Sequence, residues 1–118
     1  MIRYLRLYPL SKRGIILFWD DKYRDLSKSS ICEVAAFFRI KNGLLEMHSH
    51  MRANNAAFLL FMDMRILMSV QRIVAKELGI GVGDYIHFVD SLHIYEVEKD
   101  LAIKQSKLIT TSPLWQAL

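Results

Sequence analysis

The side chains best suited to chemistry in this sequence are spread along its whole length. They are one thiol, two basic positions, a carboxylate, an imidazole and a phenol: Cys32, Lys12-Arg13, Arg52, Asp63, His93 and Tyr95. A cysteine thiolate is a strong nucleophile, and a cation beside a cysteine lowers the pKa of its thiol. Each residue also has an ordinary structural interpretation. Cys32 lies in the apolar run SSICEVAAFF, where a thiol is often just a small core side chain.

The elements that must position these residues follow from hydrophobic patterns and turn signals. Asn42-Gly43 favours the two positive φ angles of a type I′ turn, which predicts a hairpin between two apolar-rich runs. Gly79 has the position of a glycine that ends a helix with an apolar face. We predict strands at residues 14–19, 32–41, 44–51 and 84–96, helices at 60–78 and 98–108, a surface loop at 20–30, a turn at the GIGVG glycines, and no assignment for the tail.

The hairpin register bears directly on whether Cys32 and Arg52 can share a site. Pairing Lys41 with Leu44 places Cys32 opposite Ala53, at the open end of the hairpin. Arg52 would then point to the other face of the sheet. A site that includes both side chains therefore requires a bulge or a strand end near Cys32.

The bulk composition indicates one packed domain of the α+β class, covering residues 1–118. The chain has 53% hydrophobic residues, and strands combined with one long helix are typical of that class. A net charge of +4 is compatible with an anionic partner such as a nucleotide. The basic residues are scattered, with no run of five like charges, so the sequence does not favour a nucleic-acid binder.

Cysteine usage and hydropathy bear on the compartment. A single cysteine excludes an internal disulfide and favours a reducing compartment, so we expect a cytoplasmic protein. The most apolar window, AAFLLFMDMRILM, is interrupted by Asp63 and Arg65, and we expect no membrane partner. His48 and His50 alternate on one strand, but nothing brings four ligands together, so we expect no metal site.

Taken in order, the segments SKR, W, IC, MRANN, MD and SLHIY resemble the nucleotide-binding half of thymidylate synthase and its relatives, the pyrimidine nucleotide hydroxymethylases. The intervals match that family without a gap: 20 residues from Lys12 to Cys32, 20 to Arg52, 11 to Asp63 and 30 to His93. The resemblance runs from about residue 11 to 97, roughly three quarters of this chain but about half of a full-length member, its C-terminal catalytic half.

The resemblance implies a thymidylate synthase-like mixed sheet with a long packed helix, and a role for each anchor residue. Cys32 would add to C6 of a pyrimidine ring, so that C5 can accept a methyl or hydroxymethyl group. Arg52 would bind the nucleotide phosphate, joined by Lys12 and Arg13 from the partner subunit of a homodimer. His93 and Tyr95 would hold the sugar hydroxyl. The one-carbon donor of the family is 5,10-methylenetetrahydrofolate.

Some positions depart from the family pattern, and Asp63 is the most informative of them. Thymidylate synthases have asparagine there, whereas the deoxycytidylate hydroxymethylases have aspartate. A carboxylate accepts from the amino group at C4 of cytosine, so we predict a pyrimidine nucleoside monophosphate with cytosine slightly favoured over uracil.

Other departures bear on catalysis. Ile31 replaces the proline before the cysteine, and Ala53 replaces a phosphate-binding serine. Asn55 and Leu59 stand where the family has an aspartate near the folate and a glycine that gives the pterin room. The family's N-terminal half has no counterpart before Met1. The alternatives are therefore an enzyme, complete or truncated, and a catalytically inactive nucleotide-binding or dimerisation module of the same family.

Overall fold

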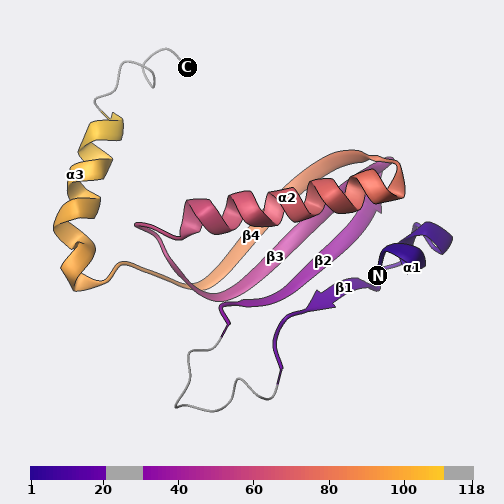
Figure 1. Cartoon of the computed structure of the whole chain (residues 1–118), viewed down its shortest axis with the longest axis horizontal. Helices are drawn as coiled ribbons and strands as arrows, with labels where there is room; N and C mark the ends of the chain where they lie inside the picture. Colours follow the sequence, from indigo (N-terminus) through magenta and orange to yellow (C-terminus); the bar gives the residue numbers. More distant parts are fainter. Residues whose placement is uncertain (21–30, 111–118) are drawn as a thin grey trace.

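The computed structural model describes residues 1–20 and 31–110. Its elements, in chain order, are α1 (Ile2–Leu7), β1 (Gly14–Leu17), β2 (Glu33–Lys41), β3 (Leu44–Asn55), α2 (Leu60–Leu78), β4 (Gly81–His93), the 3-10 turn η2 (Glu96–Glu98) and α3 (Lys99–Thr110) (Figure 1). Residues 21–30 of the predicted loop, and the tail from 111 onward, lie outside the described residues.

The four strands form one mixed sheet in the order β1-β2-β3-β4. β1 and β3 each pair antiparallel with β2, while β4 lies parallel to β3. A parallel neighbour requires a crossover connection, and α2 supplies it. Figure 1 shows α2 lying along the sheet and α3 standing apart from it. The α+β class and the long packed helix are confirmed.

The hairpin between β2 and β3 has the predicted turn, with Asn42 at φ 52° and Gly43 at φ 76°. Lys41 pairs with Leu44, and the register continues unbroken to Ala35 opposite His50. There the register shifts, because Glu33 pairs with Met51 and the residue between, Val34, has no partner on β3.

This bulge corrects the predicted pairing of Cys32 with Ala53. The Arg52 backbone N–H donates to the Cys32 carbonyl at 2.9 Å, so Cys32 lies opposite Arg52 instead. The extra residue in the bulged strand shifts every later pair by one position. A site that includes the side chains of Cys32 and Arg52 requires a bulge or a strand end near Cys32. The structure has such a bulge.

The hydrophobic core lies between the sheet and the inner face of α2. Leu67, Val74 and Ala75 of α2 are buried against Phe38, Leu45 and Met47 of the sheet. Leu5 of α1, a helix that the sequence did not predict, is fully buried in the same cluster. A six-residue helix is not stable alone, so packing of this leucine maintains α1.

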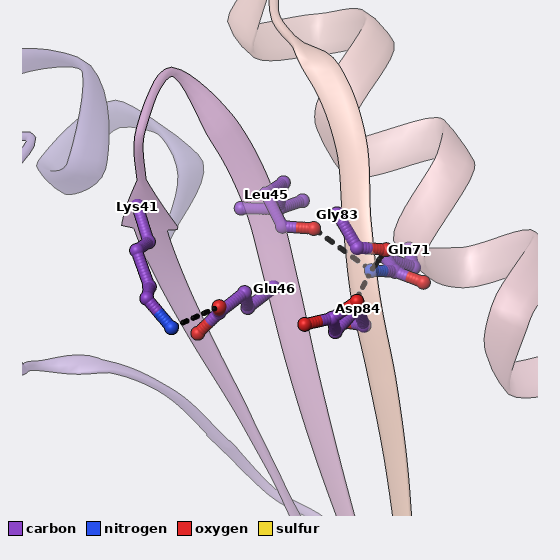
Figure 2. Close-up of polar contacts among 6 residues, drawn as sticks. All are labelled: Lys41, Leu45, Glu46, Gln71, Gly83 and Asp84. Carbon is purple, nitrogen blue, oxygen red and sulfur yellow. Dashed lines mark hydrogen bonds and ion pairs between the residues drawn. The ribbon is translucent and has the colours of Figure 1, made fainter.

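A buried amide joins α2 to the sheet. Gln71 is 1% exposed, and its Nε2 donates to the carbonyl oxygens of Leu45 at 2.8 Å, Asp84 at 3.0 Å and Gly83 at 3.2 Å. These carbonyls lie where the β3–β4 register shifts, so the amide satisfies groups that the ladder leaves open. Figure 2 shows this contact beside the Lys41–Glu46 ion pair (3.1 Å) across the hairpin.

The start and end of β4 differ from the prediction. Gly79 ends α2 in the left-handed conformation, as expected, but Gly81 and Gly83 belong to the strand rather than to a turn. A Cβ atom at Gly83 would lie 3.2 Å from the Leu45 carbonyl oxygen of β3. Glycine therefore lets the two parallel strands approach closely at this end.

The face of the sheet opposite α2 carries exposed apolar side chains. Ile15 and Leu17 of β1 and Ile86, Phe88 and Leu92 of β4 are each between 39% and 73% exposed. His50 stacks on Phe88 at 4.7 Å between ring centroids, and Phe37 packs edge-on against His50. The molecule measures 18 Å along its shortest axis, the thickness of one sheet and one helix layer.

Candidate active site

A small cavity lies where β3 and β4 end and α2 begins. Four elements or their flanking segments contribute to its lining: Cys32, Ala53, Asn54, Asn55, Leu59, Asp63, His93 and Tyr95. The carboxyl ends of neighbouring parallel strands meet here, because Asn55 pairs with His93. This is the end of a parallel pair at which ligands bind in open α/β sheets. At about 90 Å³ the cavity holds part of a nucleotide-sized ligand.

Cys32 is half-buried in the cavity wall, just before β2. Arg52 crosses over the same strand end, where its Nε donates to the Ile31 carbonyl at 3.1 Å and its backbone N–H donates to Cys32. The Arg52 side chain is exposed and is not among the residues that line the cavity. The Arg52 side chain therefore lies on the backbone beside Cys32, outside the cavity lining, and its role as a cation for the thiol remains a prediction.

Asp63 lies in the first turn of α2, where its backbone N–H donates to the Leu59 carbonyl at 2.8 Å. Its Oδ2 accepts a hydrogen bond from Nδ2 of Asn54 at 3.1 Å. Asn54 is 3% exposed, and its Oδ1 is buried with no hydrogen-bond partner among the described residues. The sequence did not single out Asn54.

Asn55 bonds to the chain itself through both ends of its amide. Its Oδ1 accepts from the backbone N–H groups of Ala57 (2.9 Å) and Phe58 (3.1 Å), and its Nδ2 donates to Glu98 at 2.7 Å. The same Glu98 oxygen accepts from the Tyr95 backbone N–H. Asn55 therefore connects the turn before α2 to the segment that follows β4.

His93 and Tyr95 bring two rings to the same side of the cavity. Their centroids are 4.9 Å apart in an edge-on arrangement, and both residues line the wall. The predicted strand was too long, because β4 ends at His93 and Tyr95 precedes η2. Tyr95 still lies beside His93, because its backbone N–H donates to the Glu98 carboxylate.

Lys12 and Arg13 lie away from this cavity. They precede β1, and Lys12 lines a groove with Arg39, Lys41 and Glu46 near the hairpin turn. Within one chain the basic pair therefore does not reach Cys32. The expectation that it acts across a homodimer interface remains a prediction.

A buried polar group lies behind the cavity and was missed by the sequence reasoning. Glu33 is 8% exposed; Ser49 donates to its Oε2 at 3.0 Å, and its Oε1 has no partner among the described residues. Burial raises the pKa of Glu33 to about 6, despite this hydrogen bond. The available signal was a charged residue inside an apolar strand.

Two further polar residues, Tyr85 and His87 of β4, also have buried polar atoms or a raised or lowered pKa. The Tyr85 hydroxyl lies 2.7 Å from Nδ1 of His87, whose Nε2 is buried without a partner among the described residues. Burial raises the pKa of Tyr85 to about 12 and lowers that of His87.

The part of the chain that the structure describes has neither a metal-binding cluster nor a membrane-spanning helix. Within residues 1–20 and 31–107, no three His, Cys, Asp or Glu side chains lie close enough to hold a metal ion. In the same part of the chain, no helix combines the length and hydropathy that a membrane crossing requires.

Comparison with known proteins relates this arrangement to one family. The family model described as thymidylate synthase matches residues 1–113. The chain is 32% identical over 95 residues to a putative thymidylate synthase of Methanocaldococcus jannaschii, covering 76% of this chain and 42% of that protein. It is 23% identical over 100 residues to the thymidylate synthase of Oenococcus oeni, covering 85% of this chain and 31% of that one.

A solved structure agrees with this relationship at the level of the fold. Thermostable thymidylate synthase A from Bacillus subtilis superposes with a TM-score of 0.82 at 24% identity, over 90% of this chain and 38% of that chain. The chain spans less than half the length of these relatives. The family match over nearly the whole sequence and the shared fold lead to one conclusion: this chain belongs to the thymidylate synthase family.

Proposed function

We propose that the cavity binds a pyrimidine nucleoside monophosphate and that Cys32 forms a covalent adduct with its base, which prepares C5 for one-carbon transfer. One observation supports this most strongly. Cys32, Asp63, His93 and Tyr95 are far apart in the sequence, yet all line one cavity. Cys32, His93 and Tyr95 have the types of the nucleophile and sugar-binding groups in the family that the chain belongs to, and Asp63 has the type found in the deoxycytidylate hydroxymethylases that the chain resembles.

The covalent step uses the thiolate of Cys32. Its sulfur forms a bond to C6, and the C5–C6 π electrons move onto C5 and into the ring. C5 then takes a proton from solvent, or a one-carbon electrophile. Loss of a proton from C5 and expulsion of the thiolate restore the aromatic base. Asp63 faces the base edge and favours cytosine, while Arg52 at the rim binds the phosphate.

The exposed apolar sheet face supports a homodimer. Its apolar side chains on the edge strands β1 and β4, with Phe37 and His50 on the strands between them, form a surface of the kind that subunit interfaces cover. In such a dimer, Lys12 and Arg13 of the partner subunit would complete the phosphate site. We further propose that residues 1–118 form one domain, equivalent to the nucleotide-binding half of the family, and that it acts in the cytoplasm, where a lone thiol stays reduced.

The family's folate donor, 5,10-methylenetetrahydrofolate, does not fit the residues present here. Asn55 uses Oδ1 twice and Nδ2 once on the chain itself, which leaves at most one N–H of its amide for a pterin. Leu59 lines the cavity wall with its side chain half exposed, at the position where the resemblance has glycine. We therefore derive no step through the folate, and the one-carbon donor is left to experiment.

Exchange of the C5 proton tests the nucleophile without any donor. The protein is incubated with dCMP, CMP or dUMP in heavy water, and loss of the C5 proton is followed by NMR. Thiolate addition, deuteration at C5 and reversal produce exchange. We expect exchange that is fastest with a cytosine nucleotide and is abolished in Cys32→Ala. Because the chain has one cysteine, slower alkylation of Cys32 with nucleotide bound gives a second readout.

The outcomes separate the candidate functions. Exchange with dUMP alone would keep Cys32 as nucleophile and contradict the cytosine preference. Nucleotide binding without exchange would favour an inactive nucleotide-binding module, the second candidate, which the bonding of Asn55 to the chain itself already supports. Absence of both binding and exchange would contradict the proposal.

A further inference from the structure

Asn54 is a buried amide in the cavity wall whose two ends differ in their bonding. Its Nδ2 donates to Asp63 Oδ2 and lies 3.1 Å from the sulfur of Met51. The opposite orientation of the amide would place its oxygen against the carboxylate of Asp63, and two acceptors repel each other. The neighbouring carboxylate therefore determines which end of the amide faces it.

This orientation leaves only acceptors for a ligand at this part of the wall. Oδ1 of Asn54 is buried without a partner among the described residues, and the Asp63 carboxylate lines the same cavity. A buried acceptor without a donor costs free energy, which a ligand that supplies the donor restores. An acceptor on each of these two hydrogen-bonded side chains matches a group with two N–H bonds.

We propose that Asn54 and Asp63 together recognise the exocyclic amino group of an aminopyrimidine. One N–H donates to the Asp63 carboxylate and the other to Oδ1 of Asn54. The oxo group of uracil at the same position has no hydrogen to donate and would face both acceptors. The inference rests on the proposed nucleotide site, and it assigns base selection to a pair of residues rather than to Asp63 alone.

Asn54 then has two tasks, and both depend on its amide. It contacts the base through Oδ1, and it positions Asp63 by donating to Oδ2. A site built around N–H donors rejects an analogue that lacks them much more strongly than an apolar pocket rejects a change in size. Asn54 should therefore change the ratio of affinities for cytosine and uracil nucleotides rather than affinity in general.

Calorimetric titration with dCMP, dUMP and N4-methyl-dCMP tests this assignment. For the wild type we expect dCMP to bind at least about tenfold more tightly than either of the others. Asn54→Ala should weaken dCMP by about tenfold and bring the dCMP and dUMP affinities close together. Gln105→Ala, which removes an exposed amide on α3 outside the cavity lining, is the matched control and should leave the ratio unchanged.

If Asn54→Ala does not fold, the affinities of the wild type for dCMP, dUMP and N4-methyl-dCMP still test the inference. Equal binding of dCMP and N4-methyl-dCMP would overturn it, because one of the two N–H bonds is then dispensable. An unchanged dCMP to dUMP ratio in folded Asn54→Ala would overturn the role of Asn54 while leaving the nucleotide site in place. Failure of the wild type to bind any of the three would overturn the proposed function and this inference together.

Discussion

Glu33 directly follows the proposed nucleophile, and its carboxyl group is buried beside Ser49. Burial stabilises the protonated form of this carboxyl group and raises its pKa from 4.5 to about 6. Because the unfolded chain releases the same proton at lower pH, the folded state holds more protons between these two values. The free energy of unfolding therefore decreases as the pH rises through this window.

Glu33→Gln should remove this pH dependence. A pKa difference of about 1.5 units corresponds to about 2 kcal/mol, lost by the wild type between about pH 4.5 and pH 7. Urea unfolding of both proteins across this range gives the difference directly. The lowered pKa of His87 acts in the opposite direction, since its protonation opposes folding, but this effect is common to both proteins.

Glu77→Gln, on the exposed surface of α2, is the matched control for the loss of one carboxylate. A difference between the wild type and Glu33→Gln that stays constant with pH would contradict the burial of an ionisable Glu33.

At the scale of the elements, α2 is attached to the sheet by both apolar and polar contacts. Leu67, Val74 and Ala75 supply the apolar contact that a helix period predicts. Gln71 lies on the same inner face and satisfies three carbonyl oxygens at the irregular part of the β3–β4 pairing. The helix that crosses from β3 to β4 thus also completes the hydrogen bonding between those strands.

Gln71→Met should destabilise the fold although methionine is similar in size and more hydrophobic. The carbonyls of Leu45, Gly83 and Asp84 lose their shared donor, at a cost of about 1–3 kcal/mol. Urea unfolding measures this loss. Arg72→Met, the neighbouring exposed position of α2, should change the free energy of unfolding by less than about 0.5 kcal/mol. Equal effects of the two substitutions would show that the amide bonds contribute nothing.

At the scale of the whole molecule, the sheet is covered by α2 on one face and exposes apolar side chains on the other. Phe88 of the edge strand β4 is 47% exposed and stacks on His50 of β3 on that open face. The basic pair Lys12-Arg13 lies at the far end of the sheet from Cys32. A homodimer through the open face would bury the apolar surface. It would also bring the basic pair of the partner subunit to the cavity that contains Cys32.

Phe88→Asp should dissociate the proposed homodimer. A carboxylate on the open face has to be desolvated at the interface, so the dimer is expected to weaken by at least about tenfold. Sedimentation velocity measures the change, and nucleotide affinity should fall with it if Lys12 and Arg13 act across the interface. Ile73→Asp, at a 61% exposed position on the outer side of α2, should leave the dimer intact. A monomeric wild type would contradict the assembly.

Local sequence signals determined several elements by themselves. The Asn42-Gly43 turn and the end of α2 at Gly79 depend on backbone angles that few residues adopt, so neighbouring residues suffice to predict them. The α+β class followed from periodicity. For the cavity, the sequence named Cys32, Asp63, His93 and Tyr95 by residue type and by the resemblance to the thymidylate synthase family, and the structure brings these four together.

The tertiary structure alone decided the features that depend on partners distant in the sequence. The bulge at Val34, the entry of Gly81 into β4 and the helix around Leu5 each require a strand or helix from elsewhere in the chain. The same holds for the buried polar groups of Glu33, Asn54 and Gln71. Hydrophobic patterns report which residues are apolar, whereas the burial of a polar side chain is decided by the particular donor or acceptor that folding brings to it.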